Sequence, residues 1–206
     1  MPLPKTKQHE QAHQIKTQYL SQVDAIQNDA RLPTEGKRTK LSKLHSSTTR
    51  QLKQLKQQRN DQLTSRQADL EKQLFGLPTT APTSDTASYR DALDRVSRAA
   101  DSKNDREMQQ LYDNARLTGD TILTKAILGH AYRSANSDIV NRYLNEPDND
   151  ALGQKGVELW QLMRGDDDAP DQAQNAMNDW VFEADKPAEI RAYSDSAIKQ
   201  MADAAE

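Results

Sequence analysis

Cysteine is absent from this sequence of 206 residues, and glycine and aromatic residues are scarce. Without cysteine, the chain can form neither a disulfide framework nor a zinc or iron site with cysteine ligands. The seven glycines fall mostly where helices should end, so they offer little material for a phosphate-binding loop or a dinucleotide-binding fingerprint. These absences exclude several common classes of site and favour helix as the main structural element.

Long apolar runs are missing as well. No stretch approaches the roughly 18 consecutive apolar residues that suggest a membrane-spanning helix. Residues 1–20 lack the apolar segment of a secretory signal peptide, so we expect no membrane insertion. Only 34% of the residues are hydrophobic, but they recur at helical intervals, which predicts an all-α protein with thin cores.

The N-terminal part of the chain contains two such periodic segments. Apolar residues follow each other at intervals of three or four in residues 5–30, and a second helix is predicted for residues 37–75. Pro33 and Gly36 lie between these two helices and oppose a continuous helix. The sequence therefore predicts a long antiparallel, coiled-coil-like hairpin over residues 1–76. Leucine recurs in the second helix at an eleven-residue spacing, which favours nearly straight or slightly right-handed packing: Leu41, Leu52, Leu63 and Leu74.

The second helix of this hairpin is the longer one. At 1.5 Å per residue the two helices measure roughly 40 and 58 Å, so the first should end near Leu63. The apolar residues beyond must pack either on the C-terminal part of the chain or on another copy, and we favour another copy. The residues expected to mediate this self-association are Leu63, Leu70, Leu74 and Phe75.

Three polar residues interrupt the apolar stripe of the second helix: Thr48, Arg59 and Arg66. They could fix the register or the oligomeric state. Alternatively, the arginine stems cover the stripe while their charged ends reach water, and the threonine methyl group packs.

A Thr/Pro-rich linker over residues 77–86 follows Gly76, which occupies a typical position after a helix end. Residues 87–206 are predicted to form a small multi-helix bundle, with Asp120 and Ser137 as N-caps. Its apolar residues, among which we count Met177 and Trp180, should form one core. Helices are expected near residues 86–101, 103–118, 120–135, 137–146, 150–164, 171–185 and 187–204.

Candidate chemistry is sparse. His9 and His13 stand four residues apart and could clamp a metal ion from one helix face, but no third ligand is close in sequence. The run Asp166–Asp168 lacks the alternating carboxylates and the central glycine of a calcium loop. We therefore expect no catalytic residue, no metal and no cofactor.

Charge is distributed unevenly. Residues 1–76 contain 14 basic and 7 acidic residues, whereas residues 77–206 contain 14 basic and 24 acidic ones. The basic side chains expected to contact a partner electrostatically are Lys37, Arg38, Lys40, Lys43, Arg50, Lys53, Lys56 and Arg59. Three alternatives are open for these side chains. They contact an acidic protein surface, for which the chain's own C-terminal part is one candidate, or they contact nucleic acid, or they form a solvated face without a partner. Two features speak against DNA binding: the charges spread around the helix instead of forming one stripe, and no aromatic residue accompanies them.

Two segments of the sequence look familiar: DLEKQLFG at residues 69–76 and GDTILTKAILGHAYRSANSDIVNRYLNEPDNDALGQKGVELWQL at residues 119–162. This part of the chain resembles small helical proteins encoded in the head-assembly regions of actinobacterial tailed phages. The resemblance implies a non-catalytic virion or assembly component, located in the virion or the host cytoplasm, with no active-site residues to carry over.

These observations lead to a functional hypothesis. We expect a structural protein that self-associates and contacts a capsid or another acidic protein surface, as a scaffold, minor capsid or inner-head component. The alternative is a nucleic-acid-binding packaging accessory protein that uses the basic helices. An enzyme is the least favoured class.

Overall fold

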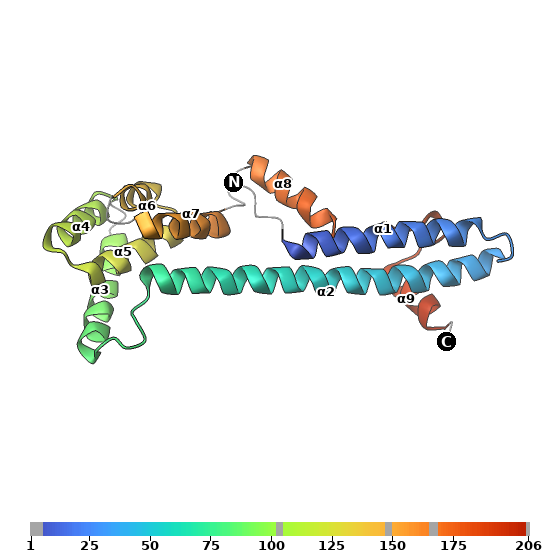
Figure 1. Ribbon diagram of the computed structural model, residues 1–206, viewed down its shortest axis with the longest axis horizontal. Helices are drawn as coiled ribbons and strands as arrows, with labels where there is room; N and C mark the ends of the chain where they lie inside the picture. Colours follow the sequence, from blue (N-terminus) through green and yellow to red (C-terminus); the bar gives the residue numbers. More distant parts are fainter. Residues whose placement is uncertain (1–5, 102–104, 147–149, 165–168, 205–206) are drawn as a thin grey trace. The chain divides into compact units, whose positions relative to one another are not determined.

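A computed structural model describes residues 6–101, 105–146, 150–164 and 169–204 (Figure 1). These parts of the chain are helical and contain no β-strand, which confirms the all-α prediction. No helix within them has the length and the apolar character needed to cross a membrane. The α-helices are α1 (Lys7–Asn28), α2 (Thr34–Phe75), α3 (Thr83–Asp101), α4 (Asp105–Thr118), α5 (Thr121–Arg133), α6 (Ser137–Leu144), α7 (Asp150–Arg164), α8 (Ala169–Trp180) and α9 (Asp195–Asp203).

The contacts divide the chain into two compact units. The bundle unit consists of the described residues within Leu63–Asp168, and the hairpin unit of those within Pro2–Gln62 and Ala169–Glu206. The sequence placed the boundary after residue 76 and assigned residues 87–206 to a single bundle. The structure instead divides the chain inside α2 and groups the C-terminal segment with α1 and the first part of α2, because its apolar residues pack there.

In the hairpin unit, hydrogen bonds join α1 to α2 in antiparallel order. The Gln8 side-chain amide donates to the Gln62 side chain at 2.9 Å, near the start of α1, and the Lys37 ammonium donates to the Gln27 carbonyl at 2.6 Å, near its end. Leu41 is fully buried on the apolar stripe of α2. Leu52, eleven residues further along the same stripe, is also fully buried. Both leucines therefore lie in the interior of the hairpin unit.

The C-terminal segment contributes two groups of apolar side chains to the hairpin unit. Val181 and Phe182, directly after α8, pack with Leu52 and with Ala12. Ile190 and Ile198, further along, pack with Tyr19, Val23 and Leu41. A single helix was predicted here for residues 187–204, but the chain forms a short 3-10 turn, Ala188–Ile190, and then α9, whose first turn is capped by the Ser194 hydroxyl accepting from the Ala197 N–H.

The bundle unit is organised around α5, which contacts α3, α4, α6 and α7. The helix begins after Asp120, whose side chain accepts a hydrogen bond of 2.9 Å from the Leu123 N–H, as the sequence predicted. Ala126, Ile127 and Ala131 are fully buried, which fits a central helix.

The leucines near the end of α2 lie in the core of this unit. Leu70 is 0% exposed, Leu74 2% and Phe75 6%, and the Phe75 ring centroid lies 5.1 Å from that of Tyr132 on α5. Leu63 is half-buried. The expectation that these residues are left uncovered within one chain is therefore wrong for Leu70, Leu74 and Phe75, because the core built around α5 covers them. Their burial removes the reason for which we predicted self-association through them.

Candidate functional site

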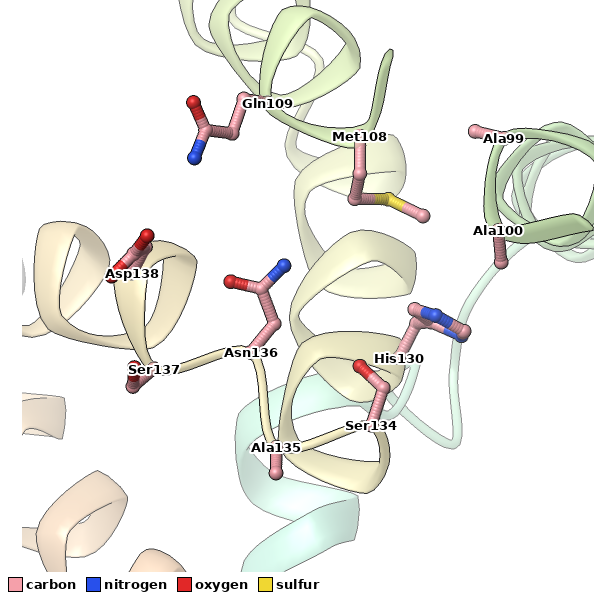
Figure 2. Close-up of a pocket in the computed structure, with 10 residues that line it drawn as sticks. All are labelled: Ala99, Ala100, Met108, Gln109, His130, Ser134, Ala135, Asn136, Ser137 and Asp138. Atoms are coloured by element: carbon pink, nitrogen blue, oxygen red, sulfur yellow. The ribbon is translucent and has the colours of Figure 1, made fainter. Parts of the chain in front are cut away.

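An open cavity of about 540 Å³ lies in the bundle unit between the end of α3, the start of α4 and the turn from α5 to α6 (Figure 2). The turn is tight because Ala135 adopts a left-handed conformation, with a φ of 58°. This conformation lets the Asn136 N–H reach the Ala131 carbonyl at 2.9 Å. The turn thereby brings polar side chains of α5 and α6 to one wall of the cavity.

Two polar side chains of this cavity, Asn136 and Ser134, form local hydrogen bonds. The Asn136 side chain accepts from the Ile139 N–H at 3.2 Å and caps α6, in place of the predicted cap Ser137. The Ser134 hydroxyl is directed at the Ala131 carbonyl, 3.5 Å away. Burial, and secondarily the nearby Arg133, lowers the pKa of His130, which favours its neutral form. The wall can hold a small polar molecule by hydrogen bonds, but it does not pair the Ser134 hydroxyl with a base.

The metal hypothesis for α1 gains no geometric support. His9 is buried and packs edge-on against Phe182, with ring centroids 5.0 Å apart, whereas His13 is exposed. In the part of the chain that the structure describes, no group of three or more potential ligands is placed to hold a metal ion. The acidic run Asp166–Asp168 lies outside the described residues.

Half of the predicted basic contact residues are engaged within the hairpin unit. The Lys37 ammonium donates to Gln27, and Arg38 pairs with Glu35 at 3.3 Å. The Lys56 ammonium lies 3.0 Å from the Asp179 carboxylate, and the Arg59 guanidinium pairs with the same carboxylate. Burial alone would raise the pKa of Asp179, but the hydrogen bonds from the Lys56 ammonium and the Arg59 guanidinium outweigh burial and lower the pKa. The acidic partner of Lys56 and Arg59 is thus Asp179, in the chain's own C-terminal segment.

Arg59 behaves differently from both sequence interpretations. It is only 7% exposed, and its guanidinium lies 5.2 Å from the Phe182 ring centroid while bonding to Asn60 and Asp179. Its charged end therefore attaches the C-terminal segment instead of reaching water. Arg66, in the bundle unit, forms two hydrogen bonds of 2.7 Å with the Glu158 carboxylate and remains exposed.

The other half of the basic set forms an exposed group that we call the basic strip: Lys40, Lys43, Arg50 and Lys53. Among the described residues, none of the four forms an ion pair with a carboxylate. At about 100° per residue their side chains fall within about 140° of arc, opposite the stripe that contains Leu41 and Leu52. The strip extends for about 20 Å along α2.

A second surface feature lies at the end of α8. Met177 is 68% exposed and Trp180 58% exposed, and at a spacing of three residues they share one side of the helix. We call this pair the α8 face. The sequence had assigned both residues to the core, and the structure corrects that assignment: the buried side chains of this region are Val181 and Phe182 directly after the helix.

Trp180 is exposed but firmly placed. The Lys16 ammonium lies 4.7 Å from its ring centroid and donates to its carbonyl at 3.2 Å. The residue before Trp180, Asp179, pairs with Lys56 and Arg59, and the residue after it, Val181, is buried. Leu20, one turn along α1 from Lys16, is 50% exposed.

Comparison with known proteins finds no matching family model, no matching characterised protein and no matching solved structure.

Proposed function

We propose that the protein is a non-catalytic assembly protein whose copies contact each other through the α8 face, within a larger particle such as a phage head. The observation that carries this proposal is the exposure of Trp180 in a segment whose backbone is fixed on both sides. In this proposal the helical hairpin holds the end of α8 in place, and the exposed side chains of Met177 and Trp180 contact the other copy.

Tryptophan and methionine suit such a role. Both are enriched in the centres of protein interfaces, and tryptophan is among the residues that contribute most to binding energy. Because Lys16 and the flanking contacts already hold Trp180, little conformational entropy is lost when a partner covers it.

A second copy of the chain is the partner that this surface fits. In a contact with two-fold symmetry the same face is used by both copies, so a small patch is doubled. Two α8 faces would then bury two tryptophans and two methionines against each other.

The place of such an assembly follows from the resemblance to phage head-assembly proteins. On that basis we propose a scaffold, minor capsid or inner-head component, located in the virion or the host cytoplasm. A partner surface on a capsid shell is compatible with the same α8 face.

The test is the molar mass of the protein in solution, measured by light scattering over a range of concentrations. The double variant Met177→Ser/Trp180→Ser should have a lower average mass than the wild type, because serine removes the exposed apolar surface while the buried Val181 and Phe182 are unchanged. The matched control is Leu117→Ser on α4, whose side chain is 86% exposed and lies in the bundle unit. A monomeric wild type, or an unchanged mass in the double variant, would reject self-association through α8.

A further inference from the structure

We propose that the basic strip of α2 binds the phosphate backbone of duplex nucleic acid without reading its sequence. This inference concerns a different surface from the α8 face and does not depend on the proposed assembly role.

The positive charge of the strip is not consumed inside the chain. Lys56 and Arg59, on the same helix, share the Asp179 carboxylate, whereas no carboxylate of the described residues pairs with the strip. Every exposed side chain of α2 between Lys40 and Asn60 is basic or neutral and polar. Within residues 40–60 of α2 the strip therefore presents positive charge with no exposed carboxylate of the same helix between its members.

The composition of this surface favours a polyanion over a folded acidic protein. Protein interfaces usually have an apolar or aromatic centre, and the exposed part of α2 from Lys40 to Asn60 has neither. Neutral amide side chains lie among the cations instead, namely Gln51, Gln54 and Gln58. Lysine, arginine and glutamine are side chains that donate to phosphate oxygens in complexes with nucleic acid.

A duplex fits better than a single strand. Proteins that hold single strands usually stack bases on aromatic side chains, and no exposed aromatic residue lies on this part of α2. A duplex carries one negative charge per roughly 1.7 Å of its axis, so about 20 Å of helix can face several phosphates at once. Contacts confined to phosphates carry no sequence information.

The experiment measures binding of the full chain to a fluorescently labelled DNA duplex of mixed sequence, by anisotropy, between about 50 and 200 mM salt. Affinity should fall steeply with salt. The slope of log K against log salt should approach about −0.9 per phosphate contact, or about −3.6 for four contacts. Absence of binding at the lowest salt, or binding that does not respond to salt, would overturn the proposal.

Two variants with the same change of net charge make the test specific. The strip variant is Lys40→Gln/Lys43→Gln/Arg50→Gln/Lys53→Gln, and it should lose most of its affinity and flatten the salt slope. The control variant replaces four other exposed basic residues: Arg90→Gln/Arg95→Gln/Arg191→Gln/Lys199→Gln. The control should retain most of the binding, and an equal loss in both variants would show that only net charge matters and would overturn the strip as the site.

A second probe separates the partner classes. Poly-glutamate at the same concentration of charge should compete with the duplex only weakly. If it competes equally well, and if the strip variant loses both interactions, the partner is an acidic protein and the phosphate assignment is wrong. The variant Met177→Ser/Trp180→Ser should bind the duplex like the wild type, so failure of the assembly proposal and failure of this one are distinguishable.

Discussion

The Tyr19 hydroxyl lies 3.1 Å from Nδ1 of His45 and donates a hydrogen bond of 2.8 Å to the Asp185 carbonyl. A tyrosine hydroxyl has a single proton, and the carbonyl can only accept. The Nδ1 atom of His45 therefore carries a hydrogen and donates to the Tyr19 oxygen. One hydroxyl group thus connects α1, α2 and the C-terminal segment inside the hairpin unit.

This arrangement predicts a pH-dependent stability of the hairpin unit. Burial, and secondarily the Lys186 ammonium, lowers the pKa of His45 despite the opposing carboxylates of Asp195 and Asp185. Below about pH 6.5 the unfolded chain takes up a proton that the folded chain resists, so stability should fall as the pH falls. The slope for this one proton is at most about 1.4 kcal/mol per pH unit, measured by urea unfolding at several pH values.

The variant His45→Asn isolates this effect, because it keeps an N–H donor near the position of Nδ1 and does not titrate. Its unfolding free energy should depend less on pH than that of the wild type. The exposed His13→Asn is the control and should follow the wild-type profile. Identical profiles for the wild type and His45→Asn would contradict the prediction.

Removing the carboxylate charge at Asp179 should destabilise the attachment of the C-terminal segment. The variant Asp179→Asn leaves the buried Arg59 guanidinium without its ionic partner. Since Asp179 is about one-third exposed, we expect a cost of about 1–3 kcal/mol, below that of a fully buried pair. Urea unfolding followed by tryptophan fluorescence measures it in a Trp160→Phe background, which leaves Trp180, next to Asp179, as the single tryptophan of the sequence. The same change at the highly exposed Asp195, which pairs with Lys186, should have a smaller effect.

Two buried tyrosines of the bundle unit should respond differently to removal of the hydroxyl group. Tyr112 donates to the Glu146 carboxylate at 2.9 Å, so Tyr112→Phe should cost about 1.5–3 kcal/mol of unfolding free energy, the range for a hydrogen bond to a charged group. The Tyr132 hydroxyl is buried and has no hydrogen-bond partner among the described residues, so Tyr132→Phe should be neutral or stabilising. Thermal unfolding of the two variants compares them directly, and an equal loss in both would contradict the assignment.

The burial of the last leucines of α2 also makes a quantitative prediction. Leu70→Ala should lower the unfolding free energy of the bundle unit by about 2–5 kcal/mol, because it leaves a cavity in a core site that is 0% exposed. The half-buried Leu63 provides the control, and Leu63→Ala should cost less. Neither change should alter the oligomeric mass, and a fall in mass for Leu70→Ala at constant stability would restore the self-association hypothesis for this residue.

Local signals in the sequence predicted much of the helical structure. The leucine spacing identified the buried stripe that includes Leu41 and Leu52, and Asp120 was identified as an N-cap, since both depend only on neighbours within a few turns. The destination of the C-terminal segment was not predicted. Phe182 and Ile198 are apolar at helical spacing, and that spacing does not say which of two possible cores they join.

The same limit applies to the surfaces. The basic character of α2 was evident, but Lys56 and Arg59 pair with Asp179, which lies 120 positions after Arg59 in the chain. Only the folded structure shows that Lys56 and Arg59 pair with a carboxylate whereas Lys43 and Arg50 stay exposed. Trp180 was counted among the core residues with the other apolar residues of this part of the chain, and composition alone does not show that its side chain is exposed.

The return of residues 181–198 to the N-terminal helices sets an order of events during synthesis. The ribosome delivers α1 and the first part of α2 well before Phe182, Ile190 and Ile198, which cover Tyr19, Leu41 and Leu52. The residues of the bundle unit are translated in between and can fold while the nascent N-terminal helices still lack their cover. Chains truncated before residue 181 would therefore leave these side chains accessible to chaperones and proteases.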